Sequence, residues 1–395
     1  MTYAYLSLGF NPDANLAREY LHRILAPAAD DHTAHLPESE LLTTIIGESI
    51  MGRDEIVIPL TGGHDSRGIL GATLNGTPTA RIFCVTIGPE DARDVVIART
   101  VCQRNALRHQ VLDPNTLDWD LDRLLSLAAR YQATPLLPPI DGLFLFDCLA
   151  RLIDPGSPVI SGYFGDAISG KHLPLLMKAA PAFVNDNAAL TPNPKLKDFF
   201  KAFVQENRAQ LEPFEGMTSY DLLDFGFRQS HRIRPAMTDM FHRSLLPYED
   251  PRWISASLSQ PVEARQNQAS FVRMLNGQFA EVFGESGYPA HTKNLGRRVL
   301  NQSSIRIRRN LRRHRSTSHL ARGDPRRNAS LRGALMAAAH SFGKRRLIPD
   351  KVTSRMIRFV ESPTDQEFEW AKWVLSTEIH VRARGLSCLE NSILD

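Results

Sequence analysis

Cysteine is scarce in this chain, and the few cysteines form no metal-binding pattern. Only four occur among 395 residues, and they are widely separated: Cys84, Cys102, Cys148 and Cys388. Because no Cys-x-x-Cys motif is present, the sequence argues against a zinc site and against a disulfide framework. Three of the four lie in apolar stretches typical of buried thiols, which fits a reducing, cytoplasmic location.

Long apolar runs are also lacking. No stretch of about 18 apolar residues is present, so no transmembrane segment is expected. Asp13 and Glu19 interrupt the N-terminal region early, which argues against a signal peptide. A hydrophobic content of 43% and a charged content of 23% are typical of a soluble globular protein, and the length is sufficient for two domains.

Acidic residues nearly disappear in one segment. Residues 297–346 contain fourteen Arg and one Lys but a single Asp, so this segment carries a net charge of +14 and the rest of the chain −10. Two interpretations stay open: a solvated Arg-rich linker, or a basic surface for an acidic partner such as a membrane surface or a nucleic acid. Phe342 is its only aromatic residue, which weakens the case for a groove that stacks single-stranded bases.

Strands alternate with helices through the first half of the sequence. Apolar patterns predict strands at 55–60, 80–87, 109–112 and 158–161, and helices at 41–50, 94–107, 117–131 and 140–153. This alternation predicts an α/β fold with a parallel, doubly wound sheet and flanking helices. The part that follows is mainly helical, with one long helix expected over 260–284.

The domain boundaries follow from these patterns. We expect an N-terminal extension at 1–36, an α/β domain at 37–180, a helical part at 181–296, the Arg-rich linker at 297–333 and a C-terminal helical segment at 334–395.

A glycine turn after the first predicted strand is the most informative motif. The apolar run 56–60 leads directly into Thr61-Gly62-Gly63-His64-Asp65-Ser66, and a helical pattern follows. Two glycines allow backbone N–H groups to face an anion, and the helix directs its positive end at the same place. The turn lacks the Lys of the common phosphate loop. Asp65 would repel a phosphate unless a cation lies between them, so we expect it to hold Mg²⁺. An ordinary strand-to-helix turn is the alternative.

A second loop repeats this combination of small residues and one carboxylate. Residues 161–170, which follow the strand at 158–161, contain Asp166 between glycines. Ligands of such sheets bind beyond the carboxyl ends of the strands, where this loop and the glycine turn are both expected. Asp65 and Asp166 would then share a Mg²⁺ site, completed by phosphate oxygens and water. Taken alone, this loop is also compatible with a simple turn.

Four motifs together resemble the synthetase domain of asparagine synthetase-like proteins, in the ATP pyrophosphatase loop superfamily. In order and spacing they are Leu60-Thr61-Gly62-Gly63-His64-Asp65-Ser66, Val85-Thr86-Ile87-Gly88, Asp94-x-x-x-Ala98-Arg99 and Ser161-Gly162-x-x-Gly165-Asp166. Pro247-Tyr248-Glu249-Asp250 is similar to that family's Pro-Phe-Leu-Asp segment. The resemblance covers about 37–295 and implies an adenine nucleotide alpha hydrolase-like fold for the α/β domain.

The resemblance also implies an activity and roles for single residues. A carboxylate would attack the α-phosphate of ATP to give an acyl-adenylate and pyrophosphate, and an amine would then displace AMP to form an amide. The implied contacts are Leu60 and Ile87 to adenosine, Ser161 and Gly162 to its ribose or base, Thr61, Gly62, Gly63 and Ser66 to pyrophosphate, and Asp65 and Asp166 to Mg²⁺. Lys293 is a separate candidate, as a catalytic cation near the adenylate, and an ordinary surface lysine is the alternative.

Two departures from the family pattern bear on the substrate. Tyr163 and Ala167 stand where the family's second motif has Glu, which puts aspartate as the substrate in doubt. The chain also has no cysteine before Cys84, although full-length relatives begin with a glutaminase domain that has a Cys nucleophile. Nitrogen would therefore come from ammonia, a separate glutaminase or an amine on another molecule. The carboxylate substrate could be a small molecule, a peptide or a sugar acid.

Three hypotheses remain. The first is an ATP-dependent amide-forming ligase. The second is a tRNA-modifying ATP pyrophosphatase, which the basic segment favours and the 161–166 motif disfavours. The third is a non-catalytic nucleotide-binding partner subunit, which Tyr163 and Ala167 favour.

Overall fold

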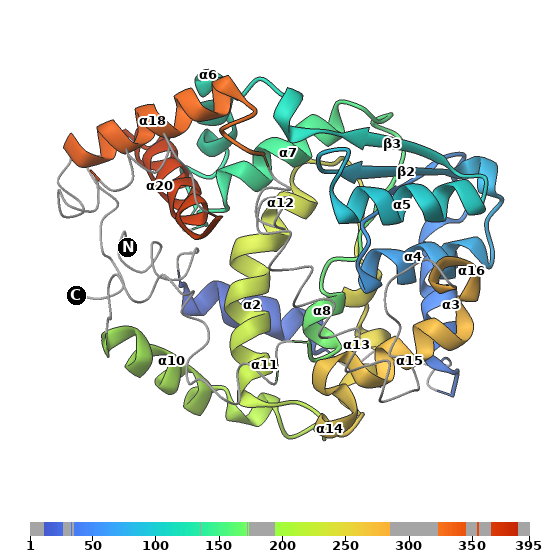
Figure 1. Ribbon diagram of the computed structural model, residues 1–395. Coiled ribbons are helices and arrows are strands. Elements are labelled where there is room, and N and C mark those ends of the chain that lie inside the picture. The colour runs from blue at the N-terminus through green and yellow to red at the C-terminus, as the bar shows by residue number, and fades with distance from the viewer. Residues whose placement is uncertain are drawn as a thin grey trace, which may run out of the picture.

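The chain folds around a five-stranded parallel sheet with helices on both faces (Figure 1). The computed structural model describes residues 12–26, 33, 35–134, 136–171, 173, 194–284, 323–344, 354 and 365–385. In the order β3-β2-β1-β4-β5, the strands are Arg108–Leu112, Ile82–Ile87, Ile56–Pro59, Val159–Ile160 and Ser244–Leu245. The predicted α/β class, the parallel pairing and the first four strands are confirmed. The two-residue strand β5 is too short to show a sequence pattern.

Alternation along the central strands creates two separate cores. Ile56 and Ile58 of β1 face one buried cluster, whereas Val57 faces the other. This follows from the two-residue period of a strand, which turns successive side chains to opposite faces. Both faces are apolar because both are covered by helices, as is usual for parallel sheets.

Three helices adjoining β1 and β2 in sequence contribute to the first core. They are α3 (Glu38–Ile50), α4 (His64–Leu74) and α5 (Arg93–Arg104). Their buried side chains join Ile56 and Ile58 in one cluster. The helical spacing that predicted α3 and α5 from the sequence is therefore the spacing of their buried faces.

The second core is covered by helices from two distant parts of the chain. Helices α6 (Leu121–Ala129) and α7 (Ile140–Ala150) share it with α18 (Ala329–Lys344) and α20 (Asp365–Ala383). Helix α20 lies against α6 and α7, and α18 packs on α20 (Figure 1). In the part of the chain that the structure describes, no helix is long and apolar enough to cross a membrane.

A further set of helices extends the first core away from the sheet. These are α2 (Ala14–Ile24), α8 (Gly165–Ile168), α10 (Pro194–Glu206), α11 (Ser219–Leu223), a π-helical segment (Asp224–Ile233), α12 (Arg234–Thr238) and α13 (Pro251–Leu258). Phe199, Phe200 and Phe203 of α10 pack around Phe227 of the π-helical segment, with ring centroids 4.6–5.7 Å apart. The aromatic face of this helix is thus a packing surface.

The prediction of one long helix over 260–284 is wrong. The chain instead forms α14 (Val262–Arg265), α15 (Ala269–Gln278) and α16 (Ala280–Phe283). The break lies at Asn267 and Gln268, which have φ angles of 56° and 60°. Left-handed backbone cannot continue a right-handed helix, and the apolar spacing on either side does not reveal it.

Several sequence predictions fall on residues that the structure does not describe. Lys293 and the Arg-rich residues 297–322 lie outside the described residues. The predicted acidic partner at 297–346 therefore stays a prediction.

Candidate functional site

Two loops meet at the carboxyl edge of the sheet, one after β1 and one after β4. These strands are neighbours, with Val57 opposite Val159. Glycine makes the close approach of the loops possible. A Cβ atom on Gly162 would lie 2.6 Å from the backbone nitrogen of Ser66, and one on Gly165 would lie 2.6 Å from Oδ1 of Asp65. Any larger residue at either position would push the two loops apart.

The structure brings together the two carboxylates that were expected to share a cation. Asp65 lies in the first turn of α4, and Asp166 lies in α8. The side-chain nitrogen of Gln268 is 3.4 Å from Oδ1 of Asp65 and 3.3 Å from Oδ1 of Asp166, so one amide group contacts both. Lys171 forms an ion pair with Oδ2 of Asp166.

The closeness of these carboxylates changes the proton affinity of Asp65. Burial raises the pKa of Asp65 well above its usual range, the charge of Asp166 and a hydrogen bond with it raise the pKa further, and Lys171 lowers it. Two adjacent carboxylates disfavour a second negative charge, and a bound cation would relieve that repulsion.

A hard divalent cation such as Mg²⁺ fits this oxygen donor set. Among the described residues, no group of three or more His, Cys, Asp or Glu side chains is placed to hold a metal ion. Asp65 and Asp166 would therefore supply two protein ligands, and the other positions would be filled by water or by a ligand. Mg²⁺ commonly binds to one or two carboxylates in this way.

The backbone N–H groups of the glycine turn donate to acceptors within the turn and in α5. The Thr61 N–H donates to Oγ of Ser66 at 3.0 Å, and the Gly63 N–H donates to Oγ1 of Thr61 at 3.1 Å. The Gly62 N–H donates to Oδ1 of Asp94, at the start of α5, at 3.2 Å. The N–H groups expected to contact pyrophosphate thus have internal acceptors, which a phosphate would have to replace.

The buried side chain of Arg67 connects this turn to a distant part of the chain. The Arg67 side chain donates to the carbonyl oxygens of Gly63 at 3.1 Å and Val282 at 3.4 Å. Its guanidinium carbon lies 4.3 Å from the centroid of the Phe283 ring, and the His64 ring stacks on the same phenylalanine. Arg67 and His64 therefore link the turn to α16.

The residues expected near adenosine lie at the carboxyl ends of three adjacent strands or directly after them. Leu60 is fully buried and donates its N–H to the Val85 carbonyl at 2.8 Å. Ile87 is half-buried at the end of β2. Ser161 is buried, and its Oγ accepts from the N–H of Tyr163 at 3.0 Å. All lie at the predicted edge, and their roles stay predictions.

Tyr163 and Ala167, the two positions that depart from the motif that the sequence resembles, are buried. The Tyr163 hydroxyl lies 3.5 Å from that of Tyr20, which donates to Oε1 of Glu249 at 2.5 Å. Arg234 donates to the same carboxylate at 3.0 Å. Ala167 is also buried. The Tyr163 hydroxyl therefore belongs to a polar cluster with Tyr20.

Three residues at the site were not identified from the sequence. Gln268 gave no signal because its surroundings have helical spacing. Lys171 could have been noticed as the only basic residue in the 161–171 loop. Tyr248 belongs to the Pro247-Tyr248-Glu249-Asp250 motif, but its hydrogen bond to the backbone carbonyl of Asp65, at 3.1 Å, forms only in the folded chain.

Comparison of the chain with protein-family models and with curated protein sequences gives no match.

Proposed function

We propose that this protein is an ATP-dependent amide-forming ligase that activates a carboxylate as an acyl-adenylate. The observation that carries the proposal is the convergence of Asp65 and Asp166 beside the glycine turn at the carboxyl edge of a parallel sheet. Parallel α/β folds bind ligands at this edge, and a carboxylate pair there suits a cation bound to phosphates.

The residues of the turn would position the nucleotide. Thr61 and Ser66 provide hydroxyl groups, Gly62 and Gly63 provide N–H groups, and the eleven-residue helix α4 directs its positive end at them. Leu60, Ile87, Ser161 and Gly162 would contact adenosine. Bound Mg²⁺ would neutralise phosphate charge and so favour departure of pyrophosphate.

The proposed reaction consists of two displacement steps. The carboxylate oxygen bonds to the α-phosphorus of ATP as pyrophosphate leaves, and an amine nitrogen then bonds to the carbonyl carbon as AMP leaves. Ammonia, a separate glutaminase or an amine on another molecule would supply the nitrogen. Tyr163 and Ala167, in place of two carboxylates of the family motif, favour an acceptor other than aspartate.

Pyrophosphate release tests the proposal. The purified protein is incubated with Mg²⁺-ATP and ammonia, with aspartate or with a panel of other carboxylic acids. We expect release that depends on one class of acid and is lost in Asp65→Ala and Asp166→Ala. Asp122→Ala, at an exposed position in α6, is the matched control and should retain activity. Release that persists in both site variants would contradict the proposal.

A non-catalytic nucleotide-binding subunit is the second candidate. It is favoured by Tyr163, whose hydroxyl contacts Tyr20 in a buried cluster at a position where the family has a carboxylate. This candidate predicts that ATP binds, and that Asp65→Ala weakens binding, while no tested acid yields pyrophosphate.

A further inference from the structure

Gln268 adopts a backbone conformation that few residues tolerate. It and Asn267 both have left-handed φ angles, at 60° and 56°, between α14 and α15. Non-glycine residues pay a steric cost in this region, and such strain persists where the surrounding contacts fix it. Gln268 is 4% exposed, so its side chain is held inside the protein.

Neighbouring contacts fix the place of this residue against α8. Arg265, three residues earlier, is buried and donates to the carbonyl oxygen of Ile168, the last residue of α8, at 2.9 Å and 3.1 Å. It also pairs with Asp221 at 2.9 Å. The left-handed turn then directs the Gln268 side chain back toward Asp166, at the start of the same helix.

A hydrogen-bond chain determines which end of the amide faces the carboxylates. Ser169 Oγ donates to the Gly165 carbonyl at 2.6 Å, so it accepts from the Gln268 Nε2 group at 2.7 Å. The same NH₂ group is directed at Oδ1 of Asp65 and Oδ1 of Asp166. The amide nitrogen therefore faces both carboxylates.

One oxygen of each carboxylate is held at a common point by this arrangement. The second oxygen of Asp166 is paired with Lys171. We propose that Gln268 is a positioning residue that orients Asp65 and Asp166 through its amide and thereby sets their affinity for a divalent cation. The inference rests on the metal role given to these carboxylates under the proposed function.

A neutral amide suits this task better than a charged group. It donates to both carboxylates without neutralising either, so their charge stays available to a cation. Groups that hold the ligands of a metal ion typically change metal affinity 10- to 100-fold when removed.

Three substitutions distinguish the effect of the Gln268 amide group on metal binding from the effect of its strained backbone. Gln268→Gly relieves the left-handed φ and removes the amide. Gln268→Asn keeps an amide on a residue that tolerates this φ, but its shorter side chain does not reach both carboxylates. Ser169→Ala leaves Gln268 in place and removes the acceptor that orients it. Gln278→Asn, at an exposed position ten residues along α15, is the control.

The measurement is Mn²⁺ binding to the full chain without ATP, followed by electron paramagnetic resonance of free Mn²⁺. We expect roughly 10- to 100-fold weaker binding in both Gln268 variants, a smaller loss in Ser169→Ala and no change in Gln278→Asn. The melting temperatures of the metal-free proteins are compared with that of the wild type, because Gln268→Gly relieves the φ angle but also removes a buried side chain and its hydrogen bonds. Weaker Mn²⁺ binding in Ser169→Ala, which retains Gln268, is not expected if Gln268 is merely structural.

The outcomes distinguish this inference from the proposed function. Equal Mn²⁺ affinity in the wild type and both Gln268 variants would overturn the inference and leave the ligase proposal standing. Mn²⁺ binding that depends on Gln268, without pyrophosphate release by the wild type for any acid, would support the inference and count against the ligase. A wild type that binds no Mn²⁺ would overturn the inference together with the metal role of Asp65 and Asp166.

Discussion

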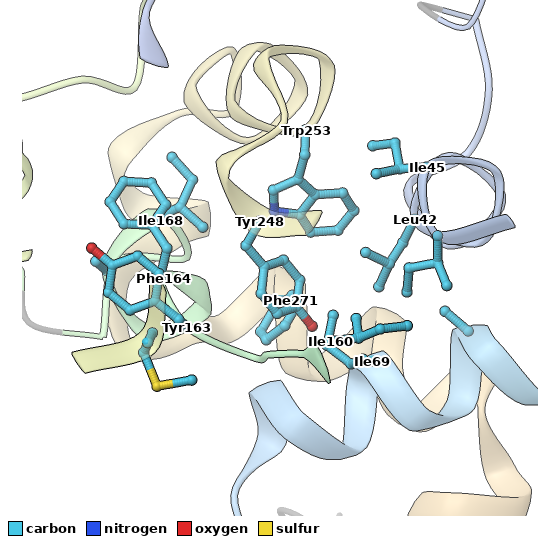
Figure 2. Packing of buried hydrophobic residues seen from close by; sticks show 14 of the residues in the cluster. Leu42, Ile45, Ile69, Ile160, Tyr163, Phe164, Ile168, Tyr248, Trp253 and Phe271 are labelled. Atoms are coloured by element: carbon cyan, nitrogen blue, oxygen red, sulfur yellow. The ribbon is translucent and has the colours of Figure 1, made fainter. Parts of the chain in front are cut away.

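The hydroxyl group of Tyr248 donates a hydrogen bond to the backbone carbonyl of Asp65, 183 residues away in sequence, across 3.1 Å. The Tyr248 ring is fully buried and packs against Trp253 and Phe271, with centroids 5.4 Å and 5.7 Å away (Figure 2). Gly68 leaves the space for this contact, because a Cβ there would lie 2.7 Å from the hydroxyl oxygen. These aromatic residues thus hold the first turn of α4, which contains Asp65, in place.

Removal of this hydroxyl should weaken the fold and loosen the site. We expect Tyr248→Phe to lower the free energy of unfolding by about 1 kcal/mol, since a buried hydrogen bond is lost while the ring is retained. Urea denaturation measures the change. Tyr220→Phe, at a partly exposed position in α11, should have a smaller effect. Equal effects would show that the hydrogen bond to Asp65 adds nothing to stability.

A methyl group at Gly165 should force the two loops apart. The added Cβ would lie 2.6 Å from Oδ1 of Asp65, so Gly165→Ala is expected to cost about 1–3 kcal/mol of stability and to abolish Mn²⁺ binding. Gly47→Ala is the matched control, since Gly47 is an exposed residue of α3 with no atom near the added Cβ. That substitution should stabilise the protein by roughly 0.5–1 kcal/mol. An unchanged Mn²⁺ affinity in Gly165→Ala would show that the close contact is not required.

The raised pKa of Asp65 predicts a specific dependence of stability on pH. In the unfolded chain this carboxyl ionises near pH 4. In the folded, metal-free protein, burial and Asp166 keep it protonated to higher pH. The folded state therefore binds more protons in this interval, and its stability falls as the pH rises from about 4 through the folded pKa.

Thermal unfolding from pH 4 to pH 8 measures this effect as the difference between wild type and Asp65→Asn. We expect the wild type to lose stability relative to the variant as the pH rises, and millimolar Mg²⁺ to reverse the loss. Asp122→Asn serves as the control for the removal of a surface charge. A difference that stays constant with pH would show that Asp65 titrates normally.

His380 predicts a loss of stability in acid. It is fully buried in α20, where burial lowers its pKa to about 4, and its Nε2 lies 2.9 Å from the Pro138 carbonyl. The unfolded chain binds a proton at this residue below about pH 6.5, whereas the folded chain does not until about pH 4. The free energy of unfolding should therefore decrease as the pH falls from about 6.5 to about 4, by roughly 3 kcal/mol at most.

The variant His380→Gln tests this explanation, because an amide nitrogen would replace Nε2 as the donor to Pro138. Its free energy of unfolding, measured in urea from pH 7 to pH 4, should fall less than that of the wild type. His22→Gln, in α2, is the control and should leave the wild-type slope unchanged. The same slope in His380→Gln and wild type would assign the acid loss to other groups.

The sequence alone determined the sheet and the place of the two loops. The apolar run at 56–60 and the pattern at 80–87 are local signals, and their alternation with helices permits little besides a parallel sheet. Since the carboxyl ends of such strands share one edge, the turn at 61–66 and the loop at 161–166 are both expected at that edge. Their direct contact depends on the strand order, which places β4 beside β1 and thereby brings Asp166 to Asp65.

Only the tertiary structure decided what surrounds these carboxylates. Gln268 reaches the carboxylate of Asp65 from a left-handed break inside a segment with the pattern of one helix, and Tyr248 reaches the backbone carbonyl of Asp65. The helical pattern depends on apolar residues three or four positions apart, so it does not reveal a break of two residues. The cost of that break is offset by contacts between residues about 100 to 200 positions apart in sequence, and such contacts exist only when the whole chain has folded.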